Sequence, residues 1–225
     1  MFIFQHPFFF CLWLLAAGIL LPAGTAMADG DDVAALQSRT PAQWQLIKED
    51  KPRNIQVYSK REDNARVRSM KAEAELPATV SDMVKLLMDF DSYPQWFWRL
   101  KEIRLLKQVS PQEAFVYAVF SPPMGFPDRD VVLHFKAEFV RNGQRAMVQA
   151  SSVADYMPEQ PGRVRMPFAR MESWIAAVDE DRIYFKGEVV MDPGGNLPIW
   201  ASNFVQRQGP YITMINLLKR LDRKS

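Results

Sequence analysis

The side chains best suited to nucleophilic or acid–base chemistry are scarce in this sequence. It has one cysteine, Cys11, and two histidines, His6 and His134. Cys11 and His6 both lie near the amino terminus, so an exported and processed chain would keep His134 alone. A catalytic triad would then need His134, and a metal site would have at most one imidazole ligand. We therefore expect no catalytic centre, no metal site and no cofactor.

His134 lies in a stretch that alternates like a β-strand. In "VVLHFKAEF" (131–139) every second residue is apolar, and His134 falls on the opposite face, beside Lys136. We expect His134 to be a solvated strand residue on the outside of a sheet.

The same strand begins at three alternating charges, Asp128 to Asp130. Arg129 shares the apolar face of the strand with Val131, and both aspartates point the other way. An isolated buried charge is too costly, so Arg129 must be paired or hydrogen-bonded. Two interpretations stay open: a polar anchor for a bound ligand, or a structural ion pair, with Glu172 as one candidate partner.

The loop before this strand, "SPPMGFP" (121–127), is apolar and rich in proline. A loop that only turned the chain would be polar and could be short. Its three prolines favour a stiff loop, while Gly125 can flex. Met124 and Phe126 are therefore candidates for contact with something outside the sheet.

The elements that position these residues follow from hydrophobic periodicity. Thr40-Pro41 is a helix-start signal, so a helix is expected over 41–50. Further helices are expected over 81–90 and from about 199 to 221, the last with a kink at Gly209-Pro210. Asn142-Gly143 marks a tight hairpin. The expected strands are 55–61, 66–76, 102–109, 113–121, 129–141, 145–153, 163–177 and 182–191.

This order of elements predicts an α+β fold in which a curved antiparallel sheet wraps around the last helix. The strand Ala114 to Phe120 is apolar on both faces, so neither face meets bulk water. One face must contact either the helix or an internal cavity.

The amino terminus reads as a secretory signal peptide. An apolar run of 14 residues, Phe8 to Leu21, is followed by Ala26-x-Ala28 before Asp29. Residues 1–28 are thus predicted to be removed on export to the periplasm or the medium, leaving 29–225 as one domain with a core of about 44–221. No Lys or Arg precedes the apolar run, so an uncleaved anchor is the alternative. The formal net charge of +2 disfavours nucleic-acid binding, and the oligomeric state is left open.

Four motifs, in order along the chain, resemble those of the START domain, the lipid-transfer domain related to steroidogenic acute regulatory protein. They are "DSYPQW" (91–96), "PDRDVV" (127–132), "MPEQPGRVR" (157–165) and "DPGGNLPIWASN" (192–203). Val131 stands where phenylalanine is usual in the family. The resemblance covers roughly Trp44 to Leu221.

The resemblance implies a helix-grip fold, with a hydrophobic tunnel between the sheet and the last helix that holds one lipid. It also implies that the loop before the Arg-Asp strand is a gate beside the last helix, in transient contact with a membrane. The candidate ligand-binding or gate residues are Met124, Phe126, Arg129, Trp200, Asn203 and Phe204. The expected function is non-enzymatic lipid binding or transfer.

Two other classes of function stay open. One is an enzyme on the same cavity fold, such as the aromatase/cyclase or hydrolase relatives. It would need acid–base groups in the cavity, for which carboxylates, Tyr117, Tyr156 or Arg129 are the candidates. The other is an accessory module that senses a lipid without carrying it. Which lipid is bound does not follow from the sequence.

Overall fold

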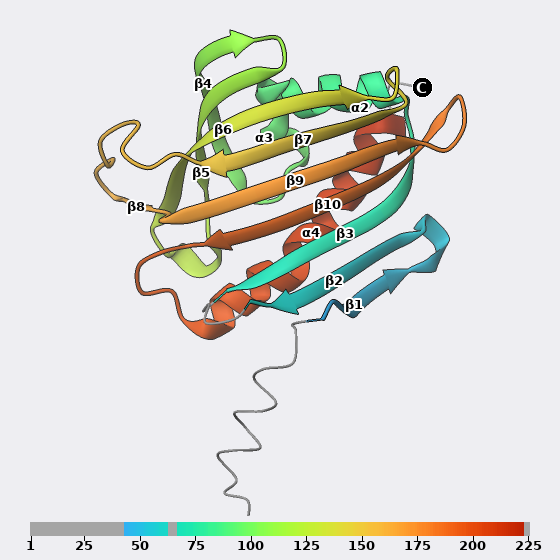
Figure 1. The fold of residues 1–225 in the computed structure, drawn as a ribbon. Coiled ribbons are helices and arrows are strands. Elements are labelled where there is room, and N and C mark those ends of the chain that lie inside the picture. Colours follow the sequence, from blue (N-terminus) through green and yellow to red (C-terminus); the bar gives the residue numbers. More distant parts are fainter. Residues whose placement is uncertain (1–42, 63–66, 223–225) are drawn as a thin grey trace, which may run out of the picture. The chain divides into compact units, whose positions relative to one another are not determined.

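The computed structural model describes residues 43–62 and 67–222 (Figure 1). They form one large sheet, short helices and a long carboxy-terminal helix. The predicted signal peptide and the Thr40-Pro41 helix start lie outside the described residues.

The sheet has ten strands in the order β1-β2-β3-β10-β9-β7-β6-β5-β4, with β8 pairing beside β6. All pairs are antiparallel except β6 with β8. The strands are β1 (Gln45–Asp50), β2 (Ile55–Arg61), β3 (Arg68–Pro77), β4 (Leu100–Ser110), β5 (Glu113–Phe120), β6 (Asp128–Val140), β7 (Arg145–Ser152), β8 (Arg163–Arg165), β9 (Phe168–Ala177) and β10 (Arg182–Asp192).

The helices are α2 (Val80–Met88), α3 (Tyr93–Trp96) and α4 (Ile199–Asp222), with single 3-10 turns at Lys51–Arg53, Phe90–Ser92 and Pro123–Gly125. Thr79 caps α2, because its hydroxyl accepts the backbone N–H of Asp82 at 3.1 Å. The apolar face of this helix packs on β6, β7 and β9. α4 continues through Pro210, and the kink expected there stays a prediction.

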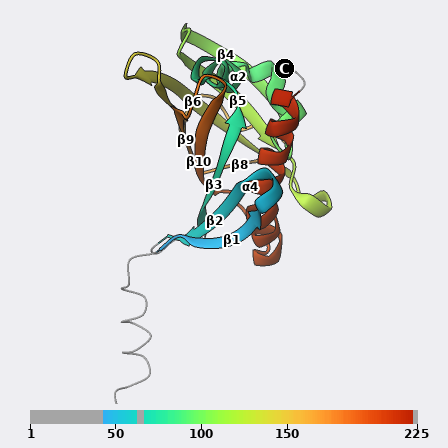
Figure 2. The same ribbon diagram turned by 90° about the vertical axis from the view of Figure 1, so that its right-hand side faces the viewer.

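The long helix α4 lies along the concave face of the sheet (Figures 1 and 2). It packs against β2, β3 and α3, and Met214, Leu217 and Leu221 are buried on its inner side. The expected α+β helix-grip architecture is therefore confirmed, with more strands than the eight that periodicity indicated.

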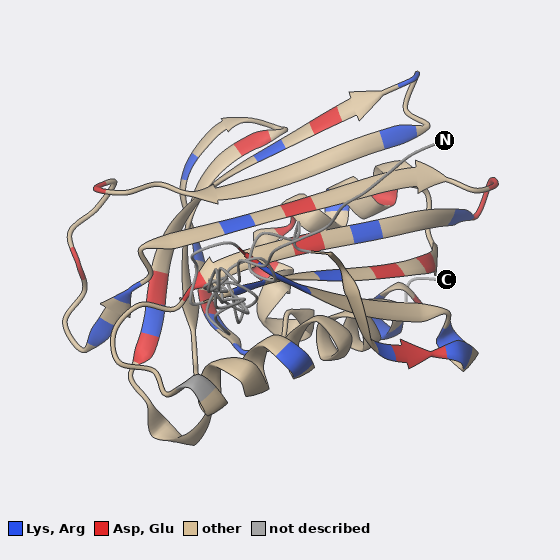
Figure 3. Ribbon diagram, turned by 60° about the horizontal axis from the view of Figure 1, so that its bottom comes forward, with Lys and Arg blue, Asp and Glu red and all other residues tan. Residues whose placement is uncertain are grey.

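The alternation read from the sequence matches the two faces of the sheet. In β3, Met70, Ala72, Ala74 and Leu76 are all buried. Their neighbours Lys71, Glu73 and Glu75 lie on the outer face, where charged residues of both signs follow the strands (Figure 3). The core lies between the sheet, α2 and α4.

The helix expected over 41–50 is wrong, because Gln45–Asp50 is strand β1. It pairs with β2, with an irregularity between Leu46 and Lys48. Asp50, at its end, accepts hydrogen bonds from Tyr211 Oη at 2.8 Å and Arg53 Nη1 at 2.9 Å. Pairing with the edge of the sheet overrides the weak helical propensity of so short a segment.

The single strand expected over 163–177 is divided into β8 and β9. Pro167 lies at the break and has no backbone N–H to donate to a neighbouring strand. Before it, the Met166 N–H donates to the Asp130 carbonyl at 2.9 Å. β8 thereby pairs in parallel with the first three residues of β6.

Candidate ligand-binding cavity

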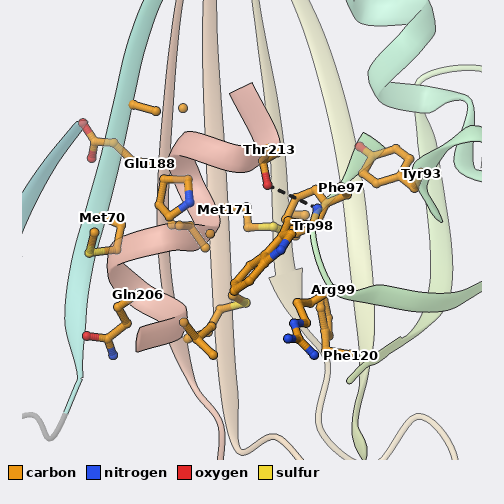
Figure 4. A pocket seen from close by; sticks show the side chains of 18 of the residues that line it. Met70, Tyr93, Phe97, Trp98, Arg99, Phe120, Met171, Glu188, Gln206 and Thr213 are labelled. Atoms are coloured by element: carbon orange, nitrogen blue, oxygen red, sulfur yellow. Dashed lines mark hydrogen bonds between the residues drawn. The ribbon is translucent and has the colours of Figure 1, made fainter. Parts of the chain in front are cut away.

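A cavity of about 220 Å³ lies between the concave face of the sheet and α4 (Figure 4). Its wall is predominantly apolar, and it includes five methionines and seven aromatic residues. These are Met70, Met166, Met171, Met191, Met214, Tyr93, Trp96, Phe97, Trp98, Phe120, Phe135 and Phe185. Unbranched methionine side chains adapt to ligands of different shape, so this wall suits a flexible apolar molecule.

The aromatic segment Trp96 to Trp98 lines the cavity and also joins it to α4. The Trp98 N–H donates to Thr213 Oγ1 at 3.3 Å, as Figure 4 shows. The Trp98 ring lies so close to α4 that a Cβ on Gly209 would be 3.3 Å from its Cε3 atom. Gly209 therefore lets this ring approach the helix backbone.

Arg129 is the most buried charged residue in the cavity wall, with 3% of its surface exposed. Its Nη1 donates to the Pro127 carbonyl at 2.5 Å and its Nε to the Pro193 carbonyl at 3.4 Å. Pro193 is held in place by a tight turn in which Asp192 Oδ1 accepts the Gly194 N–H at 2.9 Å. The inward direction expected for Arg129 is thus confirmed.

No carboxylate of the described residues lies within 4.0 Å of the Arg129 guanidinium, so the candidate partner Glu172 is wrong. Glu172 pairs with Arg170 at 2.7 Å, and Met171 and Ser173 on either side of it line the cavity. Side chains alternate along a strand, so Glu172 points to the outer face. Burial lowers the pKa of Arg129, although a guanidinium stays charged in proteins.

The ion pair of this motif is made by Asp130 instead. Asp130 has no exposed surface, and Arg165 binds it through two bonds, Nε–Oδ1 at 3.1 Å and Nη2–Oδ2 at 3.0 Å. Tyr117 Oη also donates to Asp130 Oδ2 at 2.9 Å, and Arg163 Nη1 donates to Tyr117 Oη at 2.7 Å. Burial raises the pKa of Tyr117. This network fastens the segment before β9 to the outer side of β6.

The apolar loop 121–127, here called the flap loop, lies at one end of the cavity, against the first turns of α4. Ser121 and Pro122 line the cavity. Phe126 faces Trp200 with 6.2 Å between ring centroids, and Met124 is 82% exposed. Its ends are tied down: the Ser121 N–H donates to the Arg99 carbonyl at 2.9 Å, and Lys101 Nζ lies 2.7 Å from Asp128 Oδ2.

The six predicted site residues thus divide into a wall residue and a rim. Arg129 lines the cavity. Met124, Phe126, Trp200 and Phe204 are not part of the lining. Phe126 contacts Trp200, and Phe204 contacts the lining residue Trp98 with 6.1 Å between ring centroids. Asn203 is exposed beside the lining residue Ser202.

Sequence reasoning missed several polar residues of the wall. Arg68, Arg99, Gln206 and Thr213 line the cavity but carry no motif. Arg68 shares strand parity with Met70, which is a signal that could have placed it inside. Arg99 has a positive φ of 65°, and no sequence pattern predicts this backbone conformation.

His134 lies on the outer face, as expected, but it is half-buried rather than fully solvated. Its ring stacks on Phe115 with 4.2 Å between centroids. Its Nε2 lies 2.7 Å from Glu113 Oε1, and this hydrogen bond lowers the pKa of Glu113. His134 is therefore remote from the cavity wall.

The described residues contain no group of three or more His, Cys, Asp or Glu side chains that could hold a metal ion. Among the same residues no helix has the length and apolar character needed to cross a membrane.

A curved antiparallel sheet closed by a long carboxy-terminal helix over an apolar cavity defines the class of helix-grip proteins. Among solved structures, the chain is similar to a STAR-related lipid transfer protein of Xanthomonas axonopodis. The two are 30% identical with a TM-score of 0.72, over 80% of this chain and 98% of the other. The chain therefore belongs to the STAR-related lipid transfer family.

Two further comparisons are more distant. Human StAR-related lipid transfer protein 5 is 14% identical with a TM-score of 0.68, over 86% of this chain and 93% of the other. The uncharacterized protein PA1579 of Pseudomonas aeruginosa is 23% identical over 211 residues, which is 94% of this chain and 96% of that protein. No family model matches the sequence.

Proposed function

We propose that the protein binds one lipid or similar hydrophobic molecule in the cavity, without chemical conversion, and transfers it between membranes. The observation that carries this proposal is the apolar cavity between sheet and helix, lined by five methionines and a cluster of aromatic rings. Such a wall gains free energy by removing apolar ligand surface from water, about 0.8 kcal/mol for each buried methylene. The name of the Xanthomonas relative supports the same class of function.

The polar part of the wall favours holding a ligand over converting it. Its one carboxylate is Glu188, which pairs with Lys186 at 3.4 Å. The wall also contains the phenol of Tyr93, which donates to the Leu87 carbonyl at 2.7 Å. Burial raises the pKa of Tyr93. A general acid or base must lie within hydrogen-bond reach of the substrate. Glu188 is engaged by Lys186 and the Tyr93 phenol by a backbone carbonyl, so neither side chain is placed for that role.

The rim residues support a transient membrane contact. Met124 of the flap loop is 82% exposed, and Trp200 and Phe204 in the first turns of α4 are 54% and 44% exposed. The ring contact between Phe126 and Trp200 joins the loop to this part of the helix. Between Ile199 and Leu218 the only charged residue of α4 is Arg207. Exposed Trp and Phe side chains at the start of a helix with few charges suit the boundary between lipid head groups and acyl chains. We also propose that the mature protein is exported, which would place it between bacterial membranes.

Recovery of the native ligand tests the binding proposal. Protein purified gently from its natural host is expected to release a lipid-like compound of unchanged structure in mass spectrometry. Adding that compound to the stripped protein should raise the melting temperature, because a ligand that binds only the folded state stabilises it. Time-dependent conversion of the compound by the purified protein would establish an enzyme instead. Binding without transfer between vesicles would favour an accessory lipid sensor.

The flap loop provides the test of membrane contact. The double variant M124S/F126S removes the apolar tip and is expected to slow lipid transfer between vesicles several-fold, with a smaller effect on unfolding. The control is L105S/V109S on β4, which also replaces two exposed apolar side chains, 47% and 48% exposed, outside the flap loop. Equal transfer rates for the two double variants would rule out the flap loop as the membrane contact.

A further inference from the structure

The Arg129 guanidinium is buried in the cavity wall with most of its donors unused. A guanidinium has five N–H donors, and two of them reach the carbonyls of Pro127 and Pro193. Within residues 43–62 and 67–222, the other three have no hydrogen-bond partner and no carboxylate within 4.0 Å. Burying a charge is costly unless the charge is paired, so the wall presents a site for an anion.

The other charges of the wall add to this positive potential. Arg68 and Arg99 also line the cavity, against the single carboxylate of Glu188. Glu188 pairs with Lys186 on the outer side of β10, because Gly187 and Val189 on either side of it face the cavity. Three cations therefore act on a cavity whose one carboxylate is engaged elsewhere.

The position of Arg129 sets the direction in which a ligand would lie. Arg129 is the second residue of β6, next to the flap loop, and Phe135 lines the cavity six residues further along the same strand. At about 3.3 Å per residue the two are roughly 20 Å apart. One leaflet of a bilayer has a hydrocarbon layer of roughly 15 Å, half of the full core. One acyl chain can thus extend from the guanidinium to the part of the cavity at Phe135.

The size of the cavity limits the number of chains. Its volume of about 220 Å³ is below the roughly 300–1,000 Å³ of ordinary small-molecule sites. A lipid with two long chains would need about twice the volume of a lipid with one. A cavity of this size therefore favours a ligand with one chain.

We propose that the ligand is a single-chain amphiphile with an anionic oxygen head group, bound with the head group at Arg129 and the chain directed toward Phe135. The head group can be a carboxylate or a phosphate monoester, since both accept paired bonds from a guanidinium. This inference rests on the proposed lipid-binding function and names its ligand class.

A series of ligands with one chain length and different head groups tests the inference. Binding of hexadecanoate, hexadecyl phosphate, 1-hexadecanol and hexadecylammonium to the wild-type protein is measured by titration calorimetry below their micelle concentrations. The two anions should bind about 10- to 100-fold more tightly than the alcohol, as a charge-assisted hydrogen bond predicts. The ammonium compound should bind more weakly than the alcohol, and the tighter of the two anions identifies the head group. Phosphatidylglycerol, an anionic lipid with two chains, should bind more weakly than both.

Two substitutions assign the effect to Arg129. R129M should lose the preference for anions and keep the affinity for 1-hexadecanol, while R129K should keep part of the preference because it keeps the charge. The wild-type ranking decides the ligand class even if R129M does not fold.

The outcomes separate this inference from the proposed function. Equal binding of the anions and the alcohol would overturn the anionic head group and leave lipid binding intact, and so would an R129M variant with the wild-type ranking. Stronger binding of phosphatidylglycerol than of hexadecanoate and hexadecyl phosphate would overturn the single chain. Absence of binding by all five compounds, together with no lipid in the native protein, would contradict the proposed function itself.

Discussion

Replacing Asp130 by Asn should destabilise the protein strongly, although the change is nearly isosteric. The carboxylate accepts one bond from Tyr117 and two from Arg165, at 2.9, 3.1 and 3.0 Å. The Asp130 side chain is 1% exposed and that of Arg165 is 16% exposed. In D130N an amide N–H₂ would face a guanidinium, so at least one bond would be lost and the buried cation would lose its counter-charge.

The size of the loss follows from the burial of the pair. Removing one partner of a buried ion pair costs about 3–5 kcal/mol. Arg165 keeps its bonds to the carbonyls of Met157 and Pro158, so we expect a value near the lower end, about 3 kcal/mol. A domain of this kind is stable by roughly 5–15 kcal/mol, and the loss would be a large part of that.

Urea denaturation followed by tryptophan fluorescence measures the effect. The matched control is D179N, whose carboxylate lies 2.6 Å from Arg182 but in an exposed pair, at 44% and 54%. It should shift the midpoint little, because exposed pairs are screened by water. In a double-mutant cycle, D130N/R165M should lose less than the sum of D130N and R165M. A loss under about 1 kcal/mol for D130N, or strict additivity in the cycle, would refute a buried, coupled pair.

Three other predictions concern separate parts of the chain. If the protein is exported and cleaved as the sequence predicts, amino-terminal sequencing of the native protein should begin at Asp29, whereas an intact amino terminus in the membrane fraction would indicate an anchor. Hydrogen bonds from Tyr211 and Arg53 lower the pKa of Asp50, so their stabilisation is present above the ordinary Asp pKa and is lost as the pH falls through the lowered value. Thermal melts should therefore show Y211F less stable than wild type at pH 7, with a gap that narrows below pH 4; a constant gap would contradict this. G194A should destabilise the protein by about 1–3 kcal/mol, and more than the control G143A. Both glycines have positive φ, but only at Gly194 would a Cβ lie 2.9 Å from a backbone atom, the Arg165 carbonyl oxygen; equal losses in urea denaturation would contradict it.

The sequence was most informative where a feature depends on local geometry. Side chains alternate along a strand whatever surrounds it, so the apolar period of β6 was sufficient to turn Arg129 toward the interior. The same rule placed Met70 and Ala72 inside and His134 outside. The positions of α2 and α4 followed from helical periodicity for the same reason.

Predictions from local patterns failed where pairing between distant segments decides the structure. Gln45–Asp50 has a weak helical pattern, yet an available edge on β2 made it a strand. Glu172 was the wrong candidate for Arg129, and Arg165 was not foreseen as the partner of Asp130, because its two bonds to Asp130 cross 35 positions of the sequence. Strand parity shows that a charge is buried but not which opposite charge reaches it.

The sequence by itself determined the class of fold, the inward direction of Arg129 and the apolar character of the flap loop. Each of these depends on residue type and on a repeat of two or 3.6 residues. Only the tertiary structure decided that Arg129 pairs with no carboxylate among the described residues. It also decided that Arg68 and Arg99 lie in the same cavity wall and that the cavity measures about 220 Å³. These properties depend on how closely α4 approaches the sheet, and that distance is set by the packing of side chains that are far apart in the sequence.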